Sequence, residues 1–318
     1  MAKMVFMGTP QFAATILEDL VTTDYELVAV VTQPDKAVGR KRKLTPSPVK
    51  EVALKHDIPV LQPAKLSGSP ELEQLCALKP DFIVTAAYGQ FLPTKLLDSA
   101  QIAAINVHGS LLPKYRGGAP VQYAIMNGEQ ETGVTIMYMV KQMDAGDMLA
   151  KRVIPITATD DTASIFAKMS QVGIELLHEV LPQLVQGTIS GQAQDEAQAT
   201  FAPIIKADQE PLTLALTAQE VDWKVRALRP NPGTYFKAFN GKRTKIWDVT
   251  PLSEKTSLAA GEVVAVGKHQ LKIAAAAGTV YQVNRLQPAG KAQMDITAYL
   301  NGMGQGIKEG QKLITDEQ

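Results

Sequence analysis

The sequence predicts an α/β protein in which a Rossmann-like open sheet is followed by a small β-barrel of the oligonucleotide-binding (OB) type. Three observations lead to this prediction. Short apolar runs alternate with helical patterns in the first half of the chain, as in a parallel sheet covered by helices. Closely spaced short strands follow residue 206, as in a small barrel. The length of 318 residues also exceeds the usual size of one hydrophobic core.

The domain boundaries follow from a change in composition near residue 190. Residues 187–200 are rich in Gln, Ala and Gly and lack apolar periodicity, which is typical of a linker. We therefore expect a first domain over residues 1–189, a linker over 190–205 and a barrel domain over 206–318.

The first domain begins with a short apolar strand and a helix-start signal. Thr9 and Pro10 fit the N-cap and the first position of a helix that ends near Leu20. The further elements expected in this domain are strand 26–32, helix 48–56, strand 60–61, helix 70–78, strand 81–85, strand 101–108, helix 119–126, strand 133–140, strand 148–156 and helix 161–185. Ligands of such open sheets bind beyond the carboxyl ends of the strands.

Residues 33–50 interrupt this alternation. They carry six basic residues against one acidic residue, with three prolines and one glycine, so we expect a long exposed loop. One interpretation is a solvated, mobile loop. The other is a phosphate-binding loop in which Arg40, Lys41, Arg42 and Lys43 contact a nucleic-acid backbone.

The second domain opens with a helix expected over residues 218–228, for which Thr217 and Glu220 form a capping box. Asn240-Gly241 is a two-residue hairpin signal. The strands expected here are 234–239, 243–249, 262–266, 270–275 and 279–286, with a closing helix over 295–302.

Net charge is zero overall but uneven along the chain. Residues 206–318 hold 15 Lys and Arg against 11 Asp and Glu, which leaves a net charge of −4 for residues 1–205. Within 226–291 the count is 11 basic residues against 3 acidic ones. This asymmetry favours a polyanion-binding second domain, although a solvated surface would show it by chance as well.

A candidate site lies between residues 105 and 147. Asn106 and His108 alternate at the end of a strand and therefore point to the same face. A Gly- and Pro-rich loop follows, and then an apolar strand. Asp144 lies in the Gly-containing turn after that strand. The amide and the imidazolium can donate to a developing oxyanion, and the carboxylate can orient the imidazole or accept a proton from an attacking amine. Such a site needs no Ser or Cys nucleophile.

These residues match a family motif. Asn106, His108-Gly109-Ser110-Leu111-Leu112-Pro113, Arg116-Gly117 and Asp144-x-Gly146-Asp147 together resemble the formyltransferases that use 10-formyltetrahydrofolate, and most of all those that formylate methionyl-tRNA. The resemblance covers nearly the whole chain. It implies the formyltransferase fold in the first domain and a tRNA-binding barrel in the second. It also implies 10-formyltetrahydrofolate as formyl donor and methionyl initiator tRNA as acceptor.

The resemblance also implies roles for particular residues. Asn106, His108 and Asp144 would be catalytic. The folate donor would contact Tyr88, Gly89, Ser110, Leu111, Leu112 and Pro113. The tRNA would contact Arg40, Lys41, Arg42, Lys43, Lys242, Arg243 and Lys245. Asp147 fits either a second carboxylate of the site or a cap of the Asp144 turn. The chain departs from the family at 211–215, where Pro-Leu-Thr-Leu-Ala stands in place of an expected Asp-Trp.

The remaining features place the protein in a broad class. A single cysteine, Cys76, fits a reducing compartment, and we find neither a secretory signal nor an apolar stretch of membrane-spanning length. The His, Cys, Asp and Glu residues show no metal-ligand spacing. We therefore expect a cytoplasmic, monomeric protein without a metal or a membrane partner.

Three functions compete at this stage. The first is formylation of methionyl-tRNA. The second is the same chemistry on a small amine, or hydrolysis of the formyl donor, neither of which requires basic residues in 33–50 or in the barrel. The third is a nucleic-acid-binding protein with a decayed catalytic domain, which the complete motif disfavours. The first prediction accounts for most of the sequence.

Overall fold

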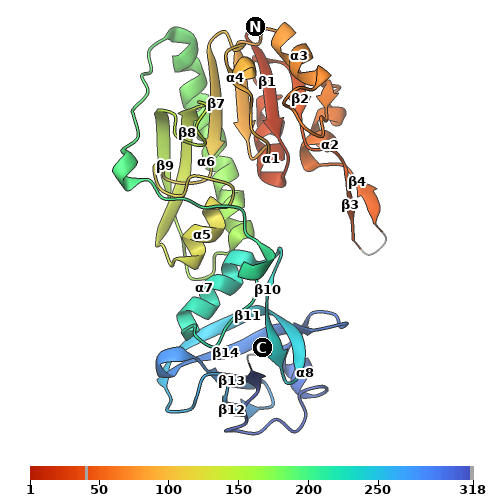
Figure 1. The fold of residues 1–318 in the computed structure, drawn as a ribbon, viewed down its shortest axis with the longest axis vertical. Coiled ribbons are helices and arrows are strands. Elements are labelled where there is room, and N and C mark those ends of the chain that lie inside the picture. The colour runs from red at the N-terminus through yellow and green to blue at the C-terminus, as the bar shows by residue number, and fades with distance from the viewer. Residues whose placement is uncertain (40–41, 316–318) are drawn as a thin grey trace. The chain divides into compact units, whose positions relative to one another are not determined.

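The computed structural model describes residues 1–39 and 42–315, and the chain divides into two compact units (Figure 1). The N-terminal unit comprises residues 1–120, 131–155 and 166–203, and the C-terminal unit comprises residues 121–130, 156–165 and 204 onward. Two short segments of the first half of the chain thus cluster with the C-terminal unit. The expected boundaries of the domains and the linker stay predictions.

A seven-stranded sheet forms the centre of the N-terminal unit, in the order β5-β2-β1-β6-β7-β8-β9. Its strands are β1 (Lys3–Gly8), β2 (Glu26–Val31), β5 (Val60–Leu61), β6 (Phe82–Ala86), β7 (Ala103–His108), β8 (Glu131–Tyr138) and β9 (Met148–Pro155). The strands from β5 to β7 are parallel, as expected, whereas β8 and β9 are each antiparallel to their neighbours. The connection over 139–147 is too short for the crossover that a parallel β8–β9 pair would require.

The helices of this unit are α1 (Gln11–Leu20), α2 (Pro48–Lys55), α3 (Pro70–Ala77), α4 (Thr94–Leu97) and most of α6 (Thr162–Gln186), with a 3-10 turn at Glu196–Gln198. Ser47 and Ser69 cap α2 and α3, since each side chain accepts the backbone N–H three residues on. The expected N-cap of α1 is wrong: the Thr9 hydroxyl instead donates to the Tyr88 carbonyl (3.0 Å).

We expected the basic stretch 33–50 to be a long exposed loop, but part of it is regular. It contains a two-stranded antiparallel ribbon of β3 (Lys36–Val38) and β4 (Lys43–Thr45), which projects from the N-terminal unit (Figure 1). Arg40 and Lys41 lie outside the described residues. Arg42 has a positive φ of 47°, and both Arg42 and Lys43 are exposed.

The C-terminal unit is built on an antiparallel sheet in the order β12-β13-β14-β11-β10-β16, with β15 paired to β14. Its strands are β10 (Thr234–Phe239), β11 (Lys242–Lys255), β12 (Val263–Gly267), β13 (Gln270–Ala274), β14 (Thr279–Pro288), β15 (Met294–Asp295) and β16 (Ile314–Thr315). Its helices are α5 (Pro120–Met126), α7 (Ala218–Leu228) and α8 (Ile296–Leu300), with 3-10 turns at Ala207–Gln209 and Ala276–Gly278.

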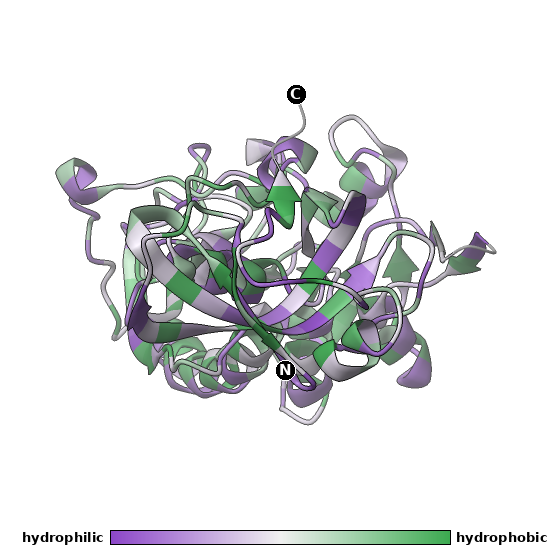
Figure 2. Cartoon of the chain, turned by 90° about the horizontal axis from the view of Figure 1, so that it is seen from below, coloured by the Kyte–Doolittle hydropathy of each residue, from purple (hydrophilic) through white to green (hydrophobic). Residues whose placement is uncertain are grey.

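The sheet curls into the expected small barrel. Ile314 pairs with β10, while the backbone of Gln311 binds Val263 (3.0 Å) at the start of β12, so the chain's last described segment joins the two edges. Hydrophilic and hydrophobic residues alternate along the long strands (Figure 2), and the apolar ones fill the interior. Leu212, in the segment that departs from the family pattern, is buried in this core.

Two local predictions for this unit are confirmed. Thr217 and Glu220 form the expected capping box of α7. Asn240 and Gly241 both have positive φ, as a type I′ hairpin turn requires. Among the described residues, none of the helices combines the length and the apolar character needed to span a membrane.

Candidate active site

Asn106 lies near the end of β7, beside Thr85 on the neighbouring parallel strand β6. The Thr85 hydroxyl donates to Asn106 Oδ1 (2.8 Å). Asp144 fixes which end of the amide is the donor, because a carboxylate only accepts and its Oδ1 lies 3.5 Å from Nδ2. Because the Asn106 side chain is only half-buried, its N–H groups remain available to a ligand.

His108 is 5 % exposed at the end of the same strand. Its Nε2 lies 3.1 Å from the carbonyl oxygen of Tyr115, and a carbonyl only accepts, so Nε2 carries a proton. Nδ1 faces Asp144 Oδ2 at 3.7 Å. We expected Asp144 to fix the tautomer, but the Tyr115 carbonyl does so. The Asp144 carboxylate instead lies on the Nδ1 side of the ring.

Asp144 is placed by a strained turn and by one backbone donor. Its φ is 51°, which is uncommon for a residue with a side chain. The N–H of Gly117 donates to Asp144 Oδ2 (2.8 Å). Gly117 itself has φ of 122°, and a Cβ there would lie 2.6 Å from the Ala202 carbonyl oxygen. Asp147 is exposed, and its carbonyl accepts the N–H of Tyr138 (2.9 Å).

Thr135 on β8 holds the loop after His108 through two hydrogen bonds. The Thr135 hydroxyl donates to the Ser110 carbonyl (2.7 Å) and accepts the Leu112 N–H (3.2 Å). Ser110 and Leu112 are buried, whereas Leu111 and Pro113 are half-buried and leave apolar surface beside His108. Of the four residues of this loop that the resemblance assigns to the folate, these two therefore offer side chains to a ligand.

Tyr88 and Gly89 follow the end of β6. The Tyr88 ring is 3 % exposed within the apolar core, and its hydroxyl has no partner among the described residues. Burial, with a smaller effect of Glu71, raises the pKa of this phenol to about 12. Its carbonyl accepts bonds from Thr9 and Gln33. Gly89 has φ of 86°. A ligand at this position would therefore meet the backbone of Tyr88 and Gly89 rather than the Tyr88 hydroxyl.

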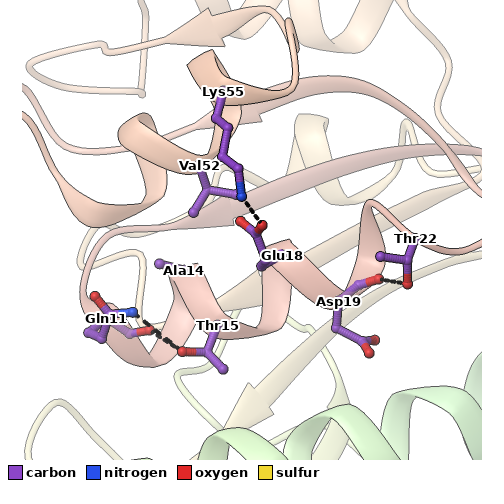
Figure 3. Close-up of a pocket in the computed structure, with 8 residues that line it drawn as sticks. All are labelled: Gln11, Ala14, Thr15, Glu18, Asp19, Thr22, Val52 and Lys55. Atoms are coloured by element: carbon purple, nitrogen blue, oxygen red, sulfur yellow. Dashed lines mark hydrogen bonds and ion pairs between the residues drawn. The ribbon is translucent and has the colours of Figure 1, made fainter.

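A separate hollow lies between α1 and α2 of the same unit (Figure 3). An ion pair between Glu18 and Lys55 (2.5 Å) crosses it. None of the residues that line it belongs to the set that converges at the ends of β6 and β7. Among the described residues, no cluster of three His, Cys, Asp or Glu side chains could hold a metal ion.

Comparison with known proteins identifies the family. The "Formyl transferase" family model matches residues 2–181, and the "Formyl transferase, C-terminal domain" model matches residues 204–304. The methionyl-tRNA formyltransferase of Ligilactobacillus salivarius is 62% identical over 100% of both chains. That of Lactiplantibacillus plantarum is 60% identical over 99% of each. The chain belongs to the methionyl-tRNA formyltransferase family.

Solved structures share the fold of this enzyme at low sequence identity. HypX from Aquifex aeolicus in complex with tetrahydrofolic acid is 19% identical, with a TM-score of 0.65 over 97% of this chain, which spans about half (48%) of that one. The N-formyltransferase from Helicobacter canadensis, in complex with folinic acid and dTDP-3-aminofucose, is 18% identical, with a TM-score of 0.69 over 91% of this chain and 100% of that one.

The basic residues assigned to tRNA in the barrel of the formyltransferase lie along β11. Arg243 and Lys245 share one face of the strand, opposite to buried Thr244. The Arg243 guanidinium stacks 3.7 Å from the centre of the Tyr235 ring, and Lys245 Nζ lies 5.3 Å from that of Trp247. Lys242 is exposed at the hairpin turn. Basic side chains interleaved with aromatic rings suit a nucleic-acid backbone with stacked bases.

Sequence reasoning missed two groups that hold side chains of the candidate site, Thr85 and the Tyr115 carbonyl. Thr85 is the residue that pairs with Asn106 across β6 and β7, so a correct strand register would have pointed to it. The Tyr115 carbonyl left no signal, because backbone groups are not distinguished by residue type.

Proposed function

We propose that the enzyme transfers the formyl group of 10-formyltetrahydrofolate to the free amino group of methionyl initiator tRNA. The observation that carries the proposal is that Asn106 Nδ2 and His108 Nδ1 both lie within 3.7 Å of the Asp144 carboxylate, near a half-exposed apolar loop. Bound there, the folate supplies an acyl group whose leaving nitrogen, N10, departs with a proton.

The residues of the site suit this donor. An amide N–H and an imidazolium N–H converge, as the carbonyl oxygen of a formyl group requires when negative charge develops on it. Leu111 and Pro113 give apolar surface for a planar ring system. No residue of the site is required to form a bond to the formyl carbon.

The roles of the three side chains follow from their geometry. Asn106 Nδ2 and a protonated His108 Nδ1 donate to the formyl oxygen as the amine attacks. Asp144 stabilises the imidazolium and accepts a proton from the attacking nitrogen, and that proton passes to N10 as the bond between N10 and the formyl carbon breaks. The products are tetrahydrofolate and formylmethionyl-tRNA.

The tRNA contacts of this proposal come from basic residues of both units. Arg42 and Lys43 on the β3–β4 ribbon, with Arg40 and Lys41, contact phosphates near the acceptor end. Lys242, Arg243 and Lys245 hold another part of the tRNA. The proposal includes preference for the initiator tRNA, a monomeric state, a cytoplasmic location and the division into residues 1–189, 190–205 and 206–318.

The test is transfer of a labelled formyl group from 10-formyltetrahydrofolate, with methionyl initiator tRNA, methionyl elongator tRNA and small amines offered in parallel. We expect label on the initiator tRNA. Label on a small amine alone would keep the chemistry and reject the acceptor. Absence of transfer to every acceptor, with the folate still bound, would reject the function.

A further inference from the structure

The turn that carries Asp144 is held by the side chain of Gln194, which lies 50 residues further along the sequence. Gln194 Nε2 donates to the carbonyl oxygens of Asp144 (2.9 Å) and Gly146 (2.8 Å). An amide NH2 has two protons, so both are used in binding this turn. Gly146 is buried, and a Cβ there would lie 1.9 Å from the Tyr138 carbonyl oxygen, so the turn has little freedom to move.

The other end of the Gln194 amide is fixed as well. Its Oε1 accepts bonds from Arg116 Nε (3.1 Å) and Nη2 (2.9 Å). Because Arg116 only donates, the amide cannot flip without placing its NH2 against the guanidinium. Arg116 is only 1 % exposed, and a guanidinium is almost never buried so fully unless it is paired.

Glu196 compensates the buried charge. Its carboxylate oxygens accept bonds from Arg116 Nη1 (3.0 Å) and Nη2 (2.7 Å). This bidentate pair holds the pKa of the Glu196 carboxyl below its ordinary value of 4.5. The next residue after Arg116 is Gly117, whose N–H binds the Asp144 carboxylate. One chain of contacts therefore fixes both the backbone and the side chain of Asp144.

We propose that Gln194, oriented by Arg116 and Glu196, is a positioning residue that sets the Asp144 carboxylate for formyl transfer. The inference rests on the proposed function of the site. It also gives residues 194–196, which the sequence assigns to a linker, a part in the active site. Within the described part of the chain, Gln194 has no hydrogen bond to His108 or Asn106, so the inference has it act through Asp144.

The test compares Gln194→Ala and Gln194→Glu with wild type. The Glu variant keeps the size and the acceptor toward Arg116 but turns a carboxylate oxygen toward the two carbonyls. We expect kcat to fall about 10- to 100-fold in both variants, as for a small misplacement of a catalytic group. KM for folate and tRNA should stay within about 2-fold, because no ligand contact is lost. Gln198→Ala, at an exposed position of the same segment, is the matched control.

A double-mutant cycle with Asp144→Asn distinguishes positioning from general support of the fold. If Gln194 acts through Asp144, Gln194→Ala should have little further effect on kcat in the Asp144→Asn background. Additive losses, or a wild-type kcat in both Gln194 variants, would overturn the inference while leaving the proposed function intact. Full activity of Asp144→Asn alone would overturn the inference and the catalytic role of Asp144, but not the proposed formyl transfer. Glu196→Gln, which keeps a hydrogen-bond acceptor but removes the charge, should give a smaller loss of kcat. A wild-type kcat in this variant would reject the part of the inference in which Glu196 orients Gln194.

Discussion

At the scale of single residues, the site depends on which protons point toward the ligand. Thr85 and Asp144 hold the Asn106 amide and the Tyr115 carbonyl holds the His108 ring, so that Nδ2 of the first and Nδ1 of the second are the donors that the proposed function uses. Neither orientation can be read from the residue types. Both come from neighbouring groups that hold each side chain in the folded protein. These donors therefore need not reorient during the reaction.

Removal of the amide donor gives the most direct test of this arrangement. Asn106→Ala should lower kcat by roughly 10²–10³-fold, the usual loss for one oxyanion donor. The side chain is half-buried, so the melting temperature should change little. Thr85→Val should lower kcat less, because it frees the amide without removing it, and Thr85→Ser should restore it. A kcat near wild type for Asn106→Ala, measured at saturating substrates, would reject its assignment.

Tyr88 allows a second test at this scale. The Tyr88→Phe variant removes a hydroxyl that has no partner among the described residues. We expect the free energy of unfolding near neutral pH to be unchanged or to rise by up to about 1 kcal/mol, since an unsatisfied buried polar group is costly. KM for folate should stay within about 2-fold. A tenfold rise would mean that the phenol contacts the donor, as the sequence-based assignment holds.

The same variant tests the raised pKa. The folded-state value of about 12 exceeds the ordinary 10.0, so folding favours the protonated phenol. The stability from this group is complete below about pH 10 and is lost as pH rises toward 12. Urea titrations on either side of this window should show a smaller loss in the Phe variant. Tyr281 and Tyr299 also have raised pKa values, so part of the alkaline loss should persist. Identical losses of stability in the wild type and in the Phe variant would contradict the raised pKa of Tyr88.

At the scale of elements, the strand–helix alternation could be predicted because burial on both faces makes parallel strands nearly continuous apolar runs. The Asn240-Gly241 turn and the Thr217–Glu220 box could be predicted because their chemistry is local. The direction of β8 against β7 could not, since the connection over 109–130 is long enough for either direction, whereas that of β9 against β8 follows from the short connection over 139–147. The Thr9 prediction is wrong because its partner, the Tyr88 carbonyl, is 79 residues away.

The candidate site divides in the same way. Asn106, His108 and Asp144 carry side-chain chemistry in a recognisable spacing, so the sequence reveals them. Gln194 stands in a polar stretch without periodicity, and only its contact with the Asp144 turn distinguishes it from Gln198. Tyr88 shows the reverse case, in which a polar residue beside the site is placed in the core.

The contact of α1 with α2 gives a prediction about elements. Lys55 and then His56 hydrogen-bond Glu18 and lower its pKa below the ordinary 4.5. Because the folded-state pKa is depressed, the contribution of Glu18 to stability is present above its unfolded value and is lost as pH falls through the folded one. Glu18→Gln should cost less than about 1 kcal/mol near neutral pH, since these groups are largely exposed. Urea titrations at pH values well below the ordinary pKa of 4.5 should show this difference from wild type shrink toward zero. A larger cost, or one that persists in acid, would mean that packing rather than the ion pair joins the helices.

At the scale of the whole molecule, the chain has no net charge but an uneven distribution of charge along the sequence. A small folate donor makes few demands on such a surface, whereas a tRNA presents a phosphate at every nucleotide. The interleaving of Arg243 and Lys245 with Tyr235 and Trp247 concentrates positive charge and stacking surface on one face of β11. The two substrates should therefore respond differently to ionic strength.

We expect kcat/KM for methionyl-tRNA to fall steeply with added salt, because each phosphate contact releases condensed counterions, while KM for the folate changes little. Arg243→Gln should reduce the slope of log(kcat/KM) against log[salt] by about one. Lys268→Gln, in the exposed turn between β12 and β13, removes the same charge away from this face and should leave the slope unchanged. Equal effects of the two variants would mean that net charge, rather than the β11 face, attracts the tRNA. A flat salt response in the wild-type enzyme would reject phosphate contacts altogether and direct the search for the acceptor toward small amines.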